Sequence, residues 1–461
     1  MIKYSYKNIN LIELKMAKEH YKIVAITALG GALEFYDFTI YALFAPYLSQ
    51  HFFANTNPLI GLINTFAVFA LGYLARPVGG LFFGHLGDKL GRKSAFSLAV
   101  FIMATATLFM GCLPDYQSMG IMAPILLIGL RLIQGFSVGG EIPGAAVFIM
   151  EHIPQKKRGA SIGVVFMSIT LGNTLGAGVG LVLTRLLSEE QMMLWGWRVP
   201  FVVGFFLGII SYVIRKKTIE TPIFIAMKRE QQIQRIPLLT LLKSSKNQLI
   251  SAFFLTAVTS SIISLFLYLP TYLANILKVN LSYAYLINLI AFFSFALITA
   301  FFGWLSDQVQ RKKLLLMGAS LLILSAYPLF CGLTSFGEQF IWVFILAISL
   351  FGGMINGSYV ILITESFPAN LRYSGVGLSY SLGVAVFGGI APLVFTWLIH
   401  IMAVAEAPAL YLFFCALMTL IAILSYNERE KIKNSKDLSL TPYASQAQPQ
   451  KTGSTVGNSG Y

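Results

Sequence analysis

The sequence predicts an all-α integral membrane protein with twelve transmembrane helices, arranged as two pseudo-symmetric six-helix bundles. Three observations support this fold class: an apolar composition, twelve apolar stretches of membrane-spanning length, and a repeat of half the chain. Of 461 residues, 56% are hydrophobic and 11% are charged, with a mean hydropathy of +0.73. Because about a quarter of the residues in a soluble protein are charged, the composition excludes a soluble enzyme and a soluble nucleic-acid-binding protein.

Twelve apolar stretches are long enough to span a membrane. A helix rises ~1.5 Å per residue, so about 20 apolar residues cross a hydrocarbon layer of ~30 Å. Most of the charged residues fall between these stretches. The predicted helices are residues 22–48, 58–83, 94–113, 119–150, 160–187, 198–215, 248–275, 282–305, 314–335, 339–364, 374–400 and 407–427.

The basic residues predict the orientation of the chain. If the twelve helices alternate in direction, 28 of the 33 Lys and Arg residues fall on one side of the membrane and three on the other. Cytoplasmic loops carry the excess of basic residues in membrane proteins. We therefore expect a multi-pass protein of the inner (plasma) membrane with both termini in the cytoplasm, and the net charge of +14 requires no nucleic-acid partner.

A loop motif occurs twice, after the second and after the eighth predicted helix. The two loops, residues 84–93 and 303–312, read GHLGDKLGRK and GWLSDQVQRK. They are 219 residues apart, and the matching residues are Gly84 with Gly303, Leu86 with Leu305, Asp88 with Asp307, Arg92 with Arg311, and Lys93 with Lys312.

A second motif repeats at nearly the same distance. Residues 151–158 read EHIPQKKR and residues 365–372 read ESFPANLR, which are 214 residues apart. Since six helices return the chain to the side where it began, we expect two parallel repeats that can rock about a site between them. The matching residues are Glu151 with Glu365, Pro154 with Pro368 and Arg158 with Arg372.

The repeat divides the chain into five parts. The first six helices form one bundle and the last six form the other, with a polar, basic linker between them. The tail after the last helix is rich in Ser, Gln and Gly and is predicted to be disordered. The expected boundaries are 1–21 for a cytoplasmic segment, 22–215 for the first bundle, 216–247 for the linker, 248–427 for the second bundle and 428–461 for the tail.

The repeated loop charges are candidates for a gate. A carboxylate at a cytoplasmic helix end can pair with Arg or with a helix N-terminus. Such contacts could hold the cytoplasmic ends of the two bundles together. The alternative is that these charges are solvated and follow from topology alone, which would not explain why Gly, Asp and Arg repeat in register.

Strongly polar side chains are rare within the predicted helices and concentrate in the first and fourth. In the first helix they follow the i, i+3, i+7 spacing of one helix face. The candidate residues for proton coupling and substrate binding are Glu34, Asp37 and Tyr41 of the first helix, Arg131, Gln134 and Glu141 of the fourth, and Asn173 of the fifth.

Buried acids suggest a coupling role. Acidic side chains persist at membrane depth when they face a cavity, pair with a cation or stay protonated. We expect Glu34 and Asp37 to carry a proton. We expect Arg131 to tune the pKa values of these two acids and to bind a substrate carboxylate. The alternative is a static ion pair that fixes helix packing. Arg76 lies near a helix end, and we expect it to extend to the membrane interface rather than bind substrate.

Both loop motifs and several helix segments resemble those of the major facilitator superfamily, over about residues 20–430. Within it the chain is similar to the metabolite:proton symporters, and most similar to the proline/betaine symporters; citrate, 2-oxoglutarate and shikimate carriers share most of the pattern. Besides the two loops, the resemblance rests on GGALEFYDFTIY (30–41), RPVGGLFFGHLGDKLGRK (76–93), RLIQGFSVGGE (131–141), WGWRVPF (195–201) and ETPIF (220–224).

The resemblance implies a major facilitator fold and a proton-coupled secondary transporter that imports a small polar organic solute by alternating access. One mid-span Arg among three acids suits a zwitterion such as proline or betaine, or a monocarboxylate. A di- or tricarboxylate symporter of the citrate or 2-oxoglutarate type is the alternative, and a non-transporting solute sensor is less favoured because neither tail is large enough for a signalling domain. We expect no enzymatic activity, no metal and no cofactor besides H+, and a chain that works as a monomer within the lipid bilayer.

Overall fold

The structure is a computed structural model. It describes residues 24–25, 27–29, 31–32, 35–37, 39–53, 57–90, 92–139, 145–147, 149–150, 153–216, 241–242, 245–367 and 372–426. Within these ranges the regular structure is entirely helical. A helix satisfies its own backbone hydrogen bonds, which is what a chain in hydrocarbon requires.

The first half of the chain forms the first bundle. Its first helix is described in part, and the described residues among 24–43 are helical. The described residues among 145–150, at the end of the fourth predicted helix, are helical as well. The remaining elements are α2 (Ala45–Phe52), α3 (Pro58–Leu90), α4 (Arg92–Cys112), α5 (Tyr116–Met119), α6 (Met122–Val138), η1 (Gln155–Lys157), α8 (Arg158–Leu186), α9 (Glu189–Leu194), η2 (Gly196–Arg198) and α10 (Val199–Lys216).

The second half forms the second bundle. Two of its membrane-length helices are interrupted, at Thr256 and at Gly357–Ser358. A third contains a π-helical stretch, η3. The elements are α13 (Lys246–Leu255), α14 (Ala257–Asn275), α15 (Leu281–Leu305), α16 (Arg311–Phe336), α17 (Glu338–Asn356), α18 (Tyr359–Glu365), α19 (Arg372–Gly383), η3 (Val384–Gly389), α20 (Ala391–Met402) and α21 (Pro408–Ser425).

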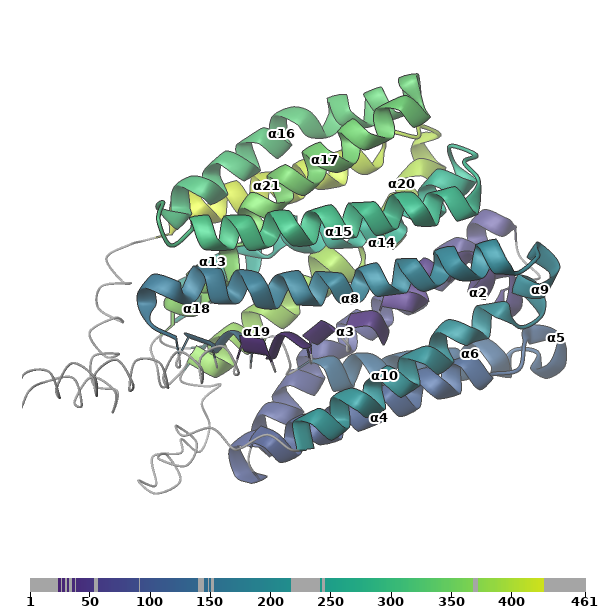
Figure 1. The fold of residues 1–461 in the computed structure, drawn as a ribbon, viewed down its shortest axis with the longest axis horizontal. Coiled ribbons are helices and arrows are strands. Elements are labelled where there is room, and N and C mark those ends of the chain that lie inside the picture. Colours follow the sequence, from purple (N-terminus) through teal and green to yellow (C-terminus); the bar gives the residue numbers. More distant parts are fainter. Residues whose placement is uncertain are drawn as a thin grey trace, which may run out of the picture.

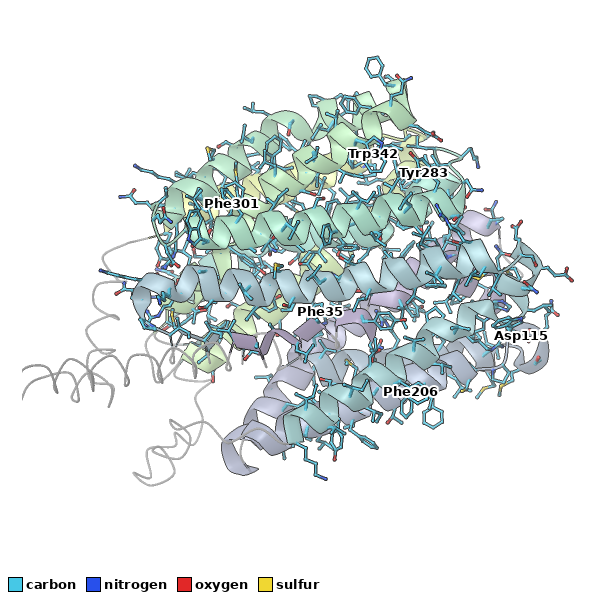
Figure 2. All side chains as sticks on the ribbon, in the orientation of Figure 1. Phe35, Asp115, Phe206, Tyr283, Phe301 and Trp342 are labelled. Atoms are coloured by element: carbon cyan, nitrogen blue, oxygen red, sulfur yellow. The ribbon has the colours of Figure 1, made fainter. Side chains whose placement is uncertain are left out.

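Each predicted transmembrane helix coincides with helical structure. Among the described residues, nine helices are long and apolar enough to cross a membrane, and two shorter apolar helices accompany them. Large apolar side chains cover the outer surface: Phe206 and Phe301 are more than half exposed, and Phe206 points away from the bundle (Figure 2). Such a surface suits lipid rather than water. The linker and both tails lie almost wholly outside the described residues, so their predicted boundaries stay predictions.

Two ends of the molecule can be distinguished. At the linker end, α10 finishes at Lys216 and α13 begins at Lys246, while α5 and α9 lie at the opposite end (Figure 1). Helix starts at the linker end follow the predicted repeat. Helices α4 and α16 both begin at the Arg of the first motif, and α8 and α19 both begin at the Arg of the second. The helix boundaries therefore keep the register of the sequence repeat.

The two bundles lie side by side, with α8 of the first running along α15 of the second (Figure 1). Glycines allow the close approach, because a Cβ at Gly163 would lie 3.0 Å from the Cα of Gly303. On another face of the contact, α3 packs against α19 and η3, where Gly389 lies against the side chain of Tyr73. Both contacts position helices that carry the candidate site.

Helices α3 and α6 of the first bundle are in direct backbone contact. A Cβ at Gly135 would overlap the carbonyl of Gly72, and one at Gly79 would overlap the carbonyl of Phe136. Small residues at such positions let helix backbones meet in a membrane. This contact fixes the position of Arg131, which lies on α6 one turn before Gly135.

Gly79→Ala should destabilise the fold, because the added methyl group would meet backbone atoms of Phe136 that cannot rotate away. Overpacking of this kind costs roughly 1–3 kcal/mol. Gly129→Ala is the matched control, since nothing lies within 4 Å of a Cβ at that position. Melting temperatures of the purified proteins should fall for Gly79→Ala and hold or rise for Gly129→Ala. Equal melting temperatures would contradict the close α3–α6 contact.

Candidate functional site

Polar groups of three helices in the first bundle meet around Gln134. The Gln134 amide nitrogen donates to the Thr107 hydroxyl at 2.8 Å and to the backbone carbonyl of Asp37 at 3.4 Å. Its amide oxygen accepts a hydrogen bond from the guanidinium of Arg131. All four residues are buried. Gln134 therefore links the predicted acid of the first helix to the predicted cation of α6.

The Asp37 carboxyl lies between the first helix, α4 and α10. A Cβ at Gly204 would overlap one carboxylate oxygen, and a Cβ at Gly208 would lie 3.5 Å from the other. Among the described residues, no group donates a hydrogen bond to this carboxyl. The nearby Thr107 hydroxyl donates to the carbonyl of Met103 at 3.1 Å instead. Asp37 is thus a buried acid held by packing rather than by an ion pair.

Arg131 is enclosed by aromatic rings. Its guanidinium carbon lies 4.4 Å from the ring centroid of Tyr41 and 4.9 Å from that of Phe69, and its side chain passes over Gly72. Cation–π contacts of this kind stabilise a desolvated guanidinium. Between Asp37 and Arg131 the structure places no direct ion pair, so the static pair considered as an alternative does not form between these two residues.

The remaining predicted residues of the first bundle have separate neighbours or lie outside the described ranges. Tyr41 donates a hydrogen bond to the carbonyl of Thr65 at 3.2 Å. Asn173 accepts one from the Thr39 hydroxyl at 2.5 Å and is buried between the first helix and α8. Two predicted acids lie outside the described residues, namely Glu34 and Glu141.

Arg76 contradicts its prediction. It is 4% exposed, so its side chain is enclosed by the protein rather than extended along the outer surface. Its guanidinium carbon lies 3.9 Å above the ring of Tyr73, on helix α3, which packs against α19 of the second bundle. The prediction failed because α19 covers this side of α3, and nothing near Arg76 in the sequence indicates that cover.

A charged cluster joins the bundles at the linker end. The two carboxylate oxygens of Asp307 accept hydrogen bonds from the backbone N–H groups of Gly159 (2.8 Å) and Ala160 (2.9 Å), in the first turn of α8. Arg311 lies 3.4 Å from Asp307 and 2.6 Å from Glu365. A carboxylate at a helix N-terminus is stabilised by the exposed N–H groups and the helix dipole. We name Asp307, Arg311 and Glu365 the gate cluster.

The other repeated residues are described less fully. Asp88 falls in the last turn of α3, Gly84 one turn earlier, and Arg92 and Arg372 begin α4 and α19, but their side chains lie outside the described part, as does Glu151 altogether. Arg158 begins α8 and donates to the carbonyl of Ile153 at 3.1 Å. Of the two loop motifs, the structure therefore gives contacts for the one in the second half.

The bundles also meet away from the gate cluster. Nearer the opposite end, the Tyr285 hydroxyl on α15 donates to the carbonyl of Leu43 at 2.6 Å. Between the two levels, the Ser381 hydroxyl on α19 donates to the carbonyl of Gly139 at 3.1 Å. The bundles are therefore joined by hydrogen bonds at several levels along their contact.

Sequence reasoning missed several residues that complete the site. Thr107, Gly204 and Gly208 surround Asp37, and Tyr285 bridges the bundles. A hydroxyl in the middle of a predicted helix and two glycines at a four-residue spacing were signals that could have pointed to the first three. Among the described residues, no group of three His, Cys, Asp or Glu side chains could hold a metal ion.

Known proteins share both the sequence and the fold. The Major Facilitator Superfamily profile matches residues 27–392. The chain belongs to the Major Facilitator Superfamily. Members are transporters, so this is a membrane transporter and not an enzyme, as the sequence predicted.

Curated relatives within the superfamily are named for their solutes. The proline/betaine transporter of Salmonella typhimurium is 31% identical over 440 residues, covering 93% of this chain and 87% of that protein. A Staphylococcus haemolyticus protein with the provisional name of proline/betaine transporter is 34% identical over 409 residues, covering 88% and 86%. These relatives confirm the predicted resemblance to proline/betaine transporters.

Solved structures agree on the fold. The crystal structure of a D-xylose–proton symporter superposes with a TM-score of 0.69 at 18% identity, covering 88% of this chain and 96% of that one. A partially occluded, inward-open structure of the Escherichia coli xylose transporter XylE gives a TM-score of 0.66 at 17% identity, covering 88% and 96%. The predicted twelve-helix major facilitator fold is confirmed.

Asp307→Asn should loosen the contact between the bundles at the linker end. Asn keeps one hydrogen-bond acceptor but loses the negative charge that the N-terminus of α8 favours. The loss should weaken the interaction between this side chain and α8 by about 1 kcal/mol. The alkylation rate of a cysteine at Ile162, which is buried one turn further along α8, should rise several-fold in a background without the three native cysteines.

The control for this measurement is Glu338→Gln, which removes an exposed carboxylate at the opposite end. It should leave the alkylation rate unchanged. If Asp307→Asn also leaves the rate unchanged, the gate cluster does not hold the bundles together.

Proposed function

We propose that this chain is a proton-coupled symporter that imports a small zwitterionic solute of the proline/betaine type by alternating access. It works as a monomer in the inner membrane, with the linker end and both termini in the cytoplasm. The observation that carries the proposal is the buried Asp37 carboxyl, on a residue whose backbone carbonyl is linked to Arg131 through Gln134. The names of the relatives support the class of solute.

Asp37 has the surroundings that proton coupling needs. An ionised carboxylate buried without a hydrogen bond is costly, so the energy of this site depends strongly on whether a proton is bound. The backbones of Gly204 and Gly208 pack against the carboxyl. Loss or gain of the proton would therefore change the packing between the first helix and α10.

Gln134 gives that change a route to Arg131. Its amide contacts the Asp37 backbone, the Thr107 hydroxyl and the Arg131 guanidinium. A shift of the first helix would move the amide and with it the guanidinium. Glu34, three residues before Asp37 on the same predicted face, would share the proton-carrying role.

The gate cluster supplies the second element of alternating access. Asp307 belongs to the second bundle and caps α8 of the first. Arg311 joins it to Glu365, so the cap is held on two sides. When the bundles rock apart at the linker end, this cap must break. The corresponding residues of the first motif, Gly84, Asp88 and Arg92, would act in the same way on the second bundle.

Asp37→Asn should abolish proton-driven accumulation, because Asn cannot bind and release a proton. Proteoliposomes with an imposed pH gradient and radiolabelled proline or betaine should show accumulation reduced by more than about tenfold. Counterflow exchange, which needs no net proton movement, should persist. Glu34→Gln tests the neighbouring acid in the same assay.

Asp115→Asn is the matched control, since it makes the same change at the opposite end, where Asp115 caps the short helix α5. It should accumulate solute as the wild type does. Undiminished gradient-driven accumulation in the double variant Glu34→Gln/Asp37→Asn would overturn the coupling proposal. Accumulation of citrate or 2-oxoglutarate in place of proline and betaine would overturn the class of solute.

A further inference from the structure

The first helix is broken at Phe44, toward the end of the molecule where α5 and α9 lie. Phe44 has φ −96° and ψ 14°, which are not helical values, and α2 begins at the next residue. Pro46, in the first turn of α2, has no N–H group to donate to the carbonyl of Ala42. The N–H groups of Tyr47 and Leu48 both donate to the Phe44 carbonyl, each at 3.1 Å. The break therefore removes N–H donors that a continuous helix would supply to the turn before Phe44.

Tyr285 of the second bundle donates to that turn instead. Its hydroxyl, on α15, donates to the carbonyl of Leu43 at 2.6 Å, and its ring centroid lies 5.8 Å from that of Phe44. The ring also packs against Gly180 of α8, where a Cβ would lie 2.6 Å from a ring carbon. Tyr285 is fully buried. Its side chain therefore contacts both the first helix and α8 of the first bundle, and we name Tyr285 with these three contacts the tyrosine gate.

The break is anchored in the first bundle beyond Phe44. The rings of His51 and Phe52, at the end of α2, lie 4.8 Å and 5.9 Å from the ring of Trp197 in η2. Trp197 is fully buried. Helix α2 is thus held by its own bundle, so a separation of the bundles at this end would withdraw Tyr285 from the break.

Helices α8 and α15 carry a contact between the bundles at each of their ends. At the linker end, Asp307 follows the last residue of α15 and accepts from Gly159 and Ala160 at the start of α8. At the opposite end, Tyr285 lies near the start of α15 and contacts Gly180 near the end of α8. At ~1.5 Å per residue, Tyr285 and Asp307 are roughly 33 Å apart along the helix. One helix pair therefore carries two contacts that can form and break separately.

The chemistry of the tyrosine gate suits a reversible contact. A neutral hydroxyl–carbonyl hydrogen bond has a small net free energy when water can replace either partner, but a carbonyl left buried without a donor is costly. When the bundles separate at this end, water can reach the Leu43 carbonyl and take the place of the Tyr285 hydroxyl. The hydrogen bond therefore stabilises the closed end without preventing it from opening.

We propose that the tyrosine gate closes the transporter at the end opposite to the linker, and that it is balanced against the gate cluster at the linker end. The inference rests on the proposed alternating access and adds the residues that hold the second end. With both contacts formed, the structure has the bundles joined at both ends. Weakening one contact should then shift the population toward the form that is open at that end.

The test compares two cysteine probes on α8 of the purified full-length protein, in a background without the three native cysteines. Ile162→Cys lies one turn from the gate cluster, and Ala177→Cys lies one turn before Gly180; both positions are buried. The alkylation rate of each probe is measured in a separate protein without added solute. The readout is the ratio of the rate at Ala177→Cys to the rate at Ile162→Cys.

Tyr285→Phe keeps the ring but removes the hydroxyl, and should raise this ratio several-fold. Gly180→Ala should raise it as well, because the added methyl group would displace the ring of Tyr285. Asp307→Asn should lower the ratio several-fold. Since distant substitutions combine additively, the double variant Tyr285→Phe/Asp307→Asn should return the ratio to within about twofold of the wild type.

Two matched controls should leave the ratio unchanged. Tyr283→Phe makes the same chemical change on the same helix, at a tyrosine that is only partly buried (Figure 2). Gly178→Ala is the control for Gly180→Ala, since a Cβ there would make an ordinary contact with Leu289 at 3.5 Å.

An unchanged ratio in Tyr285→Phe would overturn the inference, whatever Gly180→Ala does. An equal rise of both rates would also overturn it, because that result indicates general loosening rather than opening at one end. Failure of the proposed function is a separate result: a wild type that accumulates no solute under a pH gradient would contradict the function, while the ratio, measured without solute, still decides whether Tyr285 holds this end closed.

Discussion

In a hydrocarbon layer, a polar group is stable only when another group of the same protein pairs with it. This requirement accounts for most of the contacts between helices here. The carbonyls of the π-helical stretch accept from Ser264 and Tyr411, and the first N–H groups of α8 donate to Asp307. Each such contact joins segments far apart in the sequence. Pairing of polar groups therefore gives specificity to bundles whose apolar surfaces alone would pack in many ways.

The sequence predicts the parts of this fold that depend on local patterns. Apolar runs reveal the twelve helices, and two motifs in register reveal the repeat. The repeated motifs also identified Asp307, Arg311 and Glu365 as candidate residues for the contact between the bundles. Helical periodicity identifies a face but not the helix that packs against it. Hence the glycines beside Asp37 were missed, and the burial of Arg76 was not predicted, because α3 is covered by α19, about 300 residues later in the sequence.

The two bundles share a fold but differ in their buried chemistry. Among the described residues, the buried charges at membrane depth, Asp37, Arg76 and Arg131, belong to the first bundle. The second bundle contributes buried hydroxyls and amides at corresponding depth, such as Thr259 and Asn356. Among the described residues, the charged side chains buried at this depth therefore lie in one half of the repeat. The other half supplies neutral hydrogen-bonding groups and the interrupted helices.

One face of α3 lies beneath the guanidinium groups of both Arg131 and Arg76. Phe69, Tyr73 and Arg76 follow the i, i+4, i+7 spacing of a helix face, and the rings of Phe69 and Tyr73 are 4.9 Å apart. Arg131 rests on Phe69 and Arg76 rests on Tyr73. Because these rings are buried and close-packed, a shift of Arg131 cannot be absorbed by empty space. A movement of Arg131 inside the first bundle would then be passed along α3 to the surface that packs against α19 and η3 of the second bundle.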